Sequence, residues 1–270
     1  MSRAVADAEG LIGKTLRKVE LFASWSDDAL ETMADAASLR QYNKGEVVIE
    51  ARSPATGIFV IVRGALLNCR SWESGKYMLM SVVHPNWPLK IAAAWDGYEM
   101  PHGLTARRDS LVLHIPRDVF IDVVKSDTRY LSEITTFLCH QLRGEFSRIN
   151  VSAVGSLRLR VAVAVFLSVL NSLILIPEAP ERVDVDDDNI GDTDLTQEEL
   201  AAMAGHSRQR VNGVLRQMER EGMLRRRGRK IEVANYLLLK DALEEEDPLN
   251  AEWVATLTEL QARLEASQRT

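Results

Sequence analysis

Cysteine is scarce in this chain, and long apolar runs are absent. The 270 residues include two cysteines, Cys69 and Cys139, so one chain can build neither a framework of several disulfides nor an iron–sulfur cluster with four thiolate ligands. The N-terminus lacks the apolar run of a secretory signal. The longest apolar stretch, VAVAVFLSVLNSLILIP, is interrupted by three polar residues and is too short and too polar to predict a membrane span. We therefore expect a cytoplasmic protein with no membrane partner.

Signatures of catalysis are missing as well. The sequence shows no nucleophile–base constellation, no metal-ligand spacing and no glycine-rich phosphate loop. The dense aspartates of residues 177–194 match no calcium loop, which favours a solvated linker over a metal site. We therefore expect no enzyme, no bound metal and no cofactor.

The sequence does have ample apolar residues and an uneven charge. Hydrophobic residues make up 46% of the chain, and a length of 270 residues suits two domains. The formal net charge of −6 argues against a protein that coats nucleic acid with its whole surface, but it allows a local basic patch. Residues 205–230 carry nine Lys/Arg and two acidic residues, so this segment has a net charge of +7 and the remainder has −13.

The spacing of hydrophobic residues changes along the chain and divides it into regions. Residues 11–40 have a helical pattern, in which Ser26 is placed to cap a helix with an acidic first turn. Short runs rich in Val, Ile and Leu follow, among them GEVVIE, GIFVIVRG, ALLNCRSW, KYMLMSVV and SLVLHI. Glycines punctuate these runs, which predicts successive short strands in a sandwich or barrel, most simply a jelly roll. The helical period returns at Arg117, and residues 157–171 indicate a further apolar helix.

One apolar seam runs along the helix expected at residues 127–154. The seam residues recur at steps of three or four, or at their sum of seven: Leu131, Ile134, Leu138, Leu142 and Ile149. The run is long and its other faces are polar, which favours a seam between two copies of the chain. A core helix that lies on its own barrel would give a similar pattern, and this alternative stays open.

The stretch LTQEELAAMAGHSRQRVNGVLRQMEREGML, residues 195–224, is typical of two short helices hinged at Gly205. Thr196 and Glu199 have the spacing of a capping box, and Ser207 is placed to cap the second helix. This pattern predicts a helix-turn-helix, whose second helix enters the major groove with its N-terminal residues against base edges. The basic run RRRGRK and a short strand come next, as in the wing of a winged helix.

Polar and basic residues of this segment are the candidate contacts to double-stranded DNA: Thr196, Ser207, Arg208, Gln209, Arg210, Asn212, Arg216, Arg226, Arg227 and Arg229. Arg208 is the first choice for bidentate base reading at guanine. Arg210 and the wing arginines favour phosphate, whereas Asn212 fits a DNA contact and a solvent-facing residue equally. A solvated basic surface, or a face that binds an acidic protein, is the alternative interpretation.

The same segment resembles the DNA-binding domain of the cyclic-AMP receptor / fumarate–nitrate regulator (CRP/FNR) family of bacterial transcription factors. LFASWSDDALETMADAASLRQYNKGEVVIEARSPATGIFVIVRGALLN is similar to that family's lead helix and first barrel strands. The resemblance implies an α+β protein with a jelly-roll sensor domain at 1–126 and a dimerisation helix at 127–154. It also implies a winged helix-turn-helix at 155–240, after which residues 241–270 form a helical extension beyond the usual family end. Gln209 stands where many members carry a glutamate that contacts cytosine, and an amide suits adenine better.

The chain departs from the family at the cyclic-nucleotide pocket. The Gly-Glu pair that holds the ribose falls on Leu89-Lys90, and the Arg-Ser pair that holds the phosphate falls on Met100-Pro101. Lys90 cannot accept hydrogen bonds from ribose hydroxyls, and Met100 brings no charge to a phosphate. We therefore expect weak cyclic AMP binding at best. The candidate effector-pocket residues are Lys90, Met100, Arg107, Arg108 and Glu145. Of these, Lys90, Arg107 and Arg108 could hold a different anion, and a haem could use His84, His102, His114 or Cys69.

Together these patterns predict a homodimeric transcriptional regulator that reads a near-palindromic DNA site without cyclic AMP gating. If it activates transcription, RNA polymerase is the expected protein partner. Two alternatives remain: the same regulator gated by an unidentified small molecule, and a protein-interaction module built on a cyclic-nucleotide-like barrel.

Overall fold

The computed structural model describes residues 3–71, 77–174, 192–193, 195–227, 230–235, 238–239 and 241–243. By their contacts these residues form two compact units, and the boundary falls between Leu142 and Arg143, within one long helix. The acidic linker expected at 177–194 lies outside the described residues apart from Asp192–Thr193. The same holds for the extension expected at 241–270 apart from its first three residues.

The first unit begins with helical elements, which are α1 (Arg3–Lys18), the 3-10 turn η1 (Glu20–Phe22) and α2 (Asp27–Ala36). As the sequence predicts, Ser26 caps α2, and its hydroxyl accepts a hydrogen bond from the backbone N–H of Ala29 at 3.2 Å. The side chain of Trp25 stacks on Tyr130 with ring centroids 4.5 Å apart and donates to the carboxylate of Glu133 at 2.8 Å. These contacts join the N-terminal helices to the start of the long helix.

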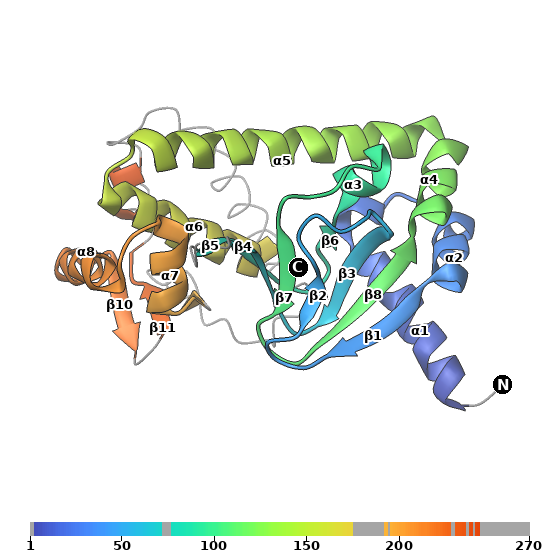
Figure 1. The fold of residues 1–270 in the computed structure, drawn as a ribbon, viewed down its shortest axis with the longest axis horizontal. Helices are drawn as coiled ribbons and strands as arrows, with labels where there is room; N and C mark the ends of the chain where they lie inside the picture. Colours follow the sequence, from blue (N-terminus) through green and yellow to red (C-terminus); the bar gives the residue numbers. More distant parts are fainter. Residues whose placement is uncertain are drawn as a thin grey trace, which may run out of the picture. The chain divides into compact units, whose positions relative to one another are not determined.

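Two four-stranded antiparallel sheets form the barrel of the first unit, in the orders β1-β8-β3-β6 and β2-β7-β4-β5 (Figure 1). The strands are β1 (Ser38–Tyr42), β2 (Val47–Ile49), β3 (Gly57–Arg63), β4 (Leu66–Ser71), β5 (Tyr77–Val83), β6 (Pro88–Leu89), β7 (Gly103–Ala106) and β8 (Ser110–Pro116). Ile61, Leu104 and Val112 form part of the apolar cluster at its centre. The predicted barrel of short strands is confirmed.

The remaining helices of this unit are α3 (Ile91–Asp96) and α4 (Arg117–Ser126), and the long α5 (Thr128–Val154) begins in it. Ile134 on α5 is only 1% exposed and belongs to the main core cluster, and Leu138 packs against that cluster. The first turns of α5 therefore cover the core of their own unit. This assigns Ile134 to that core and not to an exposed seam, because its side chain is already covered.

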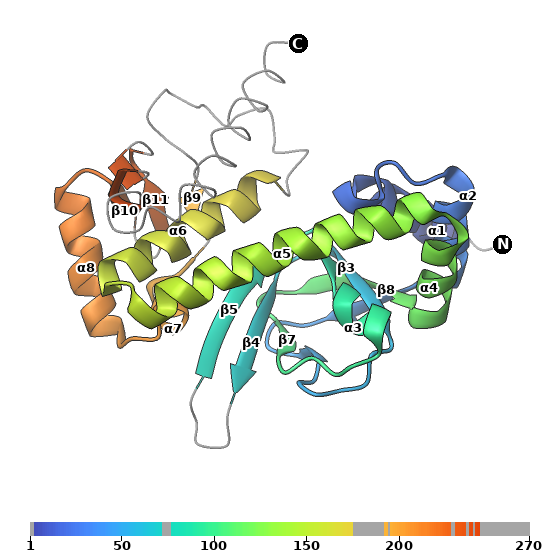
Figure 2. The same ribbon diagram turned by 90° about the horizontal axis from the view of Figure 1, so that it is seen from above.

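Among its described residues the second unit contains the end of α5, the helices α6, α7 and α8 and a small sheet. Their bounds are α6 (Leu157–Ile174), β9 (Asp192–Thr193), α7 (Gln197–Ala204), α8 (Arg208–Arg220), β10 (Leu224–Arg227) and β11 (Lys230–Val233). Helices α6, α7 and α8 contact one another, and the antiparallel sheet has the order β10-β11-β9 (Figure 2). This confirms the predicted winged helix-turn-helix. In the part of the chain that the structure describes, no helix combines the length and apolar character of a membrane span.

Candidate functional site

The turn between α7 and α8 is built by local capping. The hydroxyl of Thr196 accepts from the backbone N–H of Glu199 at 3.2 Å, and the Glu199 carboxylate accepts from the Thr196 N–H at 2.7 Å. This is the capping box that the sequence indicates. Helix α7 ends at Gly205, whose φ of 67° lies in the left-handed region that glycine adopts most easily. Ser207 then caps α8, with its hydroxyl 3.5 Å from the backbone nitrogen of Arg210.

Helix α8 has a buried face and a basic exposed face. Val211, Leu215 and Met218 are fully buried in the second unit. The exposed face carries Arg208, Gln209, Arg210 and Arg216. Within the described part of the chain, the three guanidinium groups on this face make no hydrogen bond or ion pair. The helix therefore presents cationic donors that its own fold does not use.

Two other residues of α8 differ from the exposed arginines. Asn212 is half-buried, and its Oδ1 is enclosed without a hydrogen-bond partner among the described residues. Gly213 is exposed, and a Cβ added there would meet no atom within 4 Å. The packing of the protein itself therefore does not require glycine at this position.

The wing is fastened to α8 by one arginine. Strands β10 and β11 pair antiparallel, and Arg226 on β10 forms an ion pair with Glu219 on α8. The Nε of Arg226 lies 2.8 Å from the carboxylate, and the backbone N–H of Arg226 also donates to it at 3.2 Å. This pairing lowers the pKa of Glu219. The neighbouring Arg225 is exposed and has no such partner among the described residues.

A second ion pair engages the remaining acid of the basic segment. Glu221 follows α8, and its carboxylate lies 2.5 Å from a guanidinium nitrogen of Arg158 on α6. Hydrogen bonds from Gln217 and from Arg158 lower the pKa of Glu221. Both acids of residues 205–230 are thus neutralised by arginines of the same unit. Of the other predicted wing contacts, Arg227 lies in β10 with its side chain outside the described atoms, and Arg229 lies outside the described residues.

The second half of α5 carries large apolar side chains on its surface. Leu142 is 54% exposed, and both Phe146 and Ile149 are 57% exposed. These residues are spaced by four and three positions, so they share one helix face. Leu131, nearer the start of the helix, is 39% exposed. Phe146 was not part of the predicted seam, although its spacing from Leu142 is the helical signal that could have identified it.

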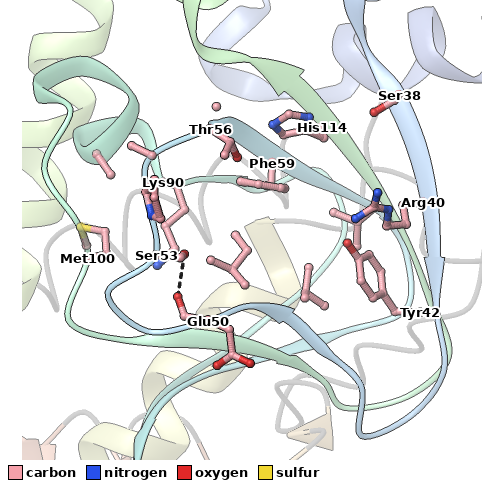
Figure 3. A pocket seen from close by; sticks show the side chains of 17 residues that line it. Ser38, Arg40, Tyr42, Glu50, Ser53, Thr56, Phe59, Lys90, Met100 and His114 are labelled. Atoms are coloured by element: carbon pink, nitrogen blue, oxygen red, sulfur yellow. Dashed lines mark hydrogen bonds between the residues drawn. The ribbon is translucent and has the colours of Figure 1, made fainter.

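A cavity of about 430 Å³ opens in the barrel of the first unit (Figure 3). It is lined by Ser38, Arg40, Tyr42, Val48, Ile49, Glu50, Ser53, Pro54, Ala55, Thr56, Gly57, Phe59, Lys90, Ala93, Met100, Val112 and His114. Lys90 and Met100 of the predicted pocket are therefore brought together. Arg107 and Arg108 are not in the lining, and Glu145 is paired instead with Arg148 on α5. Of the histidines and cysteine considered as haem ligands, His114 alone lines this cavity.

Lys90 uses its ammonium group inside the unit. Its Nζ donates to the carbonyl of His102 at 2.8 Å. Its backbone is left-handed, with φ of 66°, just before α3 begins, a conformation uncommon for a residue with a side chain. Burial lowers the pKa of Lys90 to about 8. Lys90 is therefore still mostly protonated at neutral pH, although it loses its proton more readily than an exposed lysine.

Sequence reasoning missed Arg40, Tyr42 and Phe59, and it considered His114 only as a haem ligand. These four residues come from β1, β3 and β8, and only the strand pairing brings them together at the cavity. Burial lowers the pKa of His114, and the nearby Arg40 adds to this effect, against a hydrogen bond to the backbone of Thr56. The ring is therefore neutral near pH 7. No local motif marks these positions in the sequence.

Comparison with known proteins finds a matching domain family in each of the two units. A cyclic nucleotide-binding domain model matches residues 39–127, and a Crp-like helix-turn-helix domain model matches residues 168–242. FixK2 from Bradyrhizobium japonicum shares the fold at 19% identity and a TM-score of 0.61, over 76% of this chain and 96% of that one. A CRP/FNR-family transcriptional regulator from Thermus thermophilus does so at 22% identity and a TM-score of 0.59, over 77% and 100%. The c-di-GMP responsive global regulator CLP from Xanthomonas campestris does so at 15% and 0.57, over 78% and 100%. No curated protein matches the sequence.

Proposed function

The chain belongs to the CRP/FNR family, since it carries the two domains of that family in order, and we propose that it is a sequence-specific DNA-binding transcriptional regulator. The observation that carries this proposal is the exposed face of α8. Its first turn presents Arg208, Gln209 and Arg210 directly after the capped turn at Gly205, and the fold leaves these arginines unpaired within the described residues. An α-helix presented in this way fits the major groove of DNA.

The proposed contacts divide by position on α8. Arg208 is placed to form a bidentate pair with guanine, and Gln209 suits adenine. Arg210 and Arg216 supply charge to phosphates, as does the exposed Arg225 of the wing. Arg226 holds the wing against α8 and does not itself contact DNA, because its guanidinium is paired with Glu219. The free space around Gly213 supports a close approach of the α8 backbone to DNA.

A homodimer is the proposed assembly. The exposed face of Leu142, Phe146 and Ile149 supports pairing of α5 with the same helix of a second copy. Covering one such side chain on a partner helix stabilises association by roughly 1.5–3 kcal/mol before the costs of association. Two copies would place their α8 helices in successive major grooves, about 34 Å apart, on a near-palindromic site.

Cyclic AMP is not the proposed effector. The Lys90 ammonium has no acceptor for ribose hydroxyls, and Met100 offers no charge to a phosphate. We propose that the protein has no catalytic role and acts in the cytoplasm, and that RNA polymerase is its partner if it activates transcription. The described residues contain no group of three or more His, Cys, Asp or Glu side chains that could hold a metal ion.

The experiment is a titration of genomic DNA fragments with the full chain at several salt concentrations. We expect a selected fragment to bind at least about 10³-fold more tightly than random duplex, with affinity that falls steeply as salt rises. Equal affinity for every fragment would contradict sequence-specific regulation and would favour an interaction module with a merely basic tip. Addition of cyclic AMP is expected to leave the affinity for DNA unchanged.

A further inference from the structure

The cavity in the barrel combines one unpaired cation with a neutral donor at its β1 side. Arg40 and Tyr42 are two residues apart on β1, so their side chains point to the same face of the sheet. Arg40 is exposed, and within the described residues neither its guanidinium nor the hydroxyl of Tyr42 has a hydrogen-bond partner. Figure 3 shows these two side chains at one side of the cavity and Lys90 at the other. The β1 side can therefore bind an anionic group without breaking a contact that the protein makes itself.

The lining of the cavity is more apolar than polar, and it is partly aromatic. The ring of Phe59 lies 4.8 Å from the ring of His114, measured between centroids, and both rings line the cavity. Val112 and Ala93 add aliphatic surface from β8 and α3. A volume of about 430 Å³ falls within the roughly 300–1,000 Å³ of small-molecule sites. Such a lining favours a flat apolar body over a sugar, whose hydroxyl groups would lose hydrogen bonds to water there.

The charge of the site selects among anions. The charged side chains of the lining are those of Arg40, Lys90 and Glu50, which sum to +1, so the lining balances a single negative charge. The planar fork of Arg40 matches the two oxygens of a carboxylate, whereas a dianionic phosphate would exceed the positive charge of the lining. The residues that the resemblance assigns to ribose and phosphate binding, around 89–90 and 100–101, lack the groups for that task, whereas Arg40 and Tyr42 come from a different strand.

We propose that this cavity binds a small aromatic carboxylic acid, with the carboxylate held by Arg40 and Tyr42 and the ring packed on Phe59 and Val112. The inference concerns the first unit alone and goes beyond the DNA-binding function, on which it does not depend. The ligand is thus anchored from β1, β3 and β8, and Lys90 borders its far end.

The test is a calorimetric titration of the full chain, without DNA, with 2-naphthoate as the probe and its neutral isostere 2-naphthamide as the comparison. A charge-assisted pair with Arg40 predicts that the acid binds at least about tenfold more tightly than the amide. Arg40→Gln is expected to abolish that preference, while Phe59→Leu weakens the acid and the amide alike. Arg63→Gln removes an exposed arginine of β3 that does not line the cavity, and it is expected to keep the preference.

Several outcomes would overturn the proposal. They are equal binding of acid and amide, an unchanged preference in Arg40→Gln, loss of the preference in Arg63→Gln, and no binding of either probe. Tighter binding of cyclic AMP than of 2-naphthoate would also reject it, because the site would then be one for nucleotides. The titration contains no DNA, so a negative result does not affect the DNA-binding proposal. A failure to bind DNA would likewise not affect the proposal of a carboxylate site.

Discussion

Adjacent arginines on the wing are predicted to have different roles, and this contrast can be measured. Arg225 is exposed and unpaired within the described residues, whereas Arg226 forms the ion pair with Glu219. The perturbations are Arg225→Gln and the double change Glu219→Gln with Arg226→Gln. The double change removes one charge of each sign, so it leaves the net charge of the tip as it was.

The magnitudes follow from the proposed dimer. Each phosphate contact contributes about 0.9 to the slope of log affinity against log salt concentration. Arg225→Gln removes one contact from each of two copies, so the slope should fall by roughly 1.8, with stability unchanged within about 0.5 kcal/mol. The double change should leave the slope unchanged. It should lower the free energy of unfolding of the second unit by about 0.5–1 kcal/mol, because the Glu219–Arg226 pair is only partly shielded from water.

Fluorescence anisotropy with a labelled duplex between about 50 and 200 mM salt gives the slope, and urea denaturation gives the stability. The reasoning is refuted if the double variant loses as much slope as Arg225→Gln. It is also refuted if Arg225→Gln leaves the salt dependence intact, since the wing would then make no phosphate contact through this residue.

Three further predictions concern base reading, assembly and pH. Arg208→Ala should weaken binding to the selected site by roughly 1–3 kcal/mol and relax one base position, and a uniform loss on all duplexes would exclude a base-reading role. Leu142→Glu should convert the proposed dimer to a monomer, measured as a molar mass by light scattering. The control Gln141→Glu changes an exposed polar residue of the same helix and should leave the mass unchanged. A Leu142→Glu variant that is still a dimer would contradict the seam. Arg226 lowers the pKa of Glu219, so the pair contributes fully above about pH 4.5 and this contribution is lost as the pH falls through the lowered pKa. Glu219→Gln should therefore show a smaller loss of stability between about pH 5 and pH 3, and identical acid curves would speak against the pair.

Features fixed by a few neighbouring residues were predictable from the sequence. The caps at Ser26 and Thr196 each depend on a side chain and a backbone N–H three positions later, and both are found where the pattern indicates. The strands of the barrel were visible because valine and isoleucine runs end at glycines. The helix-turn-helix combines several such local signals, which is why its outline could be predicted from the sequence.

Features that depend on the partner of a residue were not predictable in the same way. The pairing of Arg226 with Glu219 joins a strand to a helix, and nothing local separates Arg226 from Arg225. The periodicity of α5 identified Ile134 as apolar, but only its packing decided that it covers the core of its own unit. The residues that line the cavity were not predictable for the same reason. The register that sets Ser38 of β1 opposite His114 of β8 depends on the tertiary fold.

Selection of binding sites from a random duplex library, with the purified full chain, tests the central claim most directly. The account predicts a motif with two-fold symmetry, whose half-sites are centred about one turn of DNA apart and contain guanine where Arg208 reads. Recovery of no motif, or of a single half-site without its symmetric partner, would contradict a paired helix-turn-helix reader.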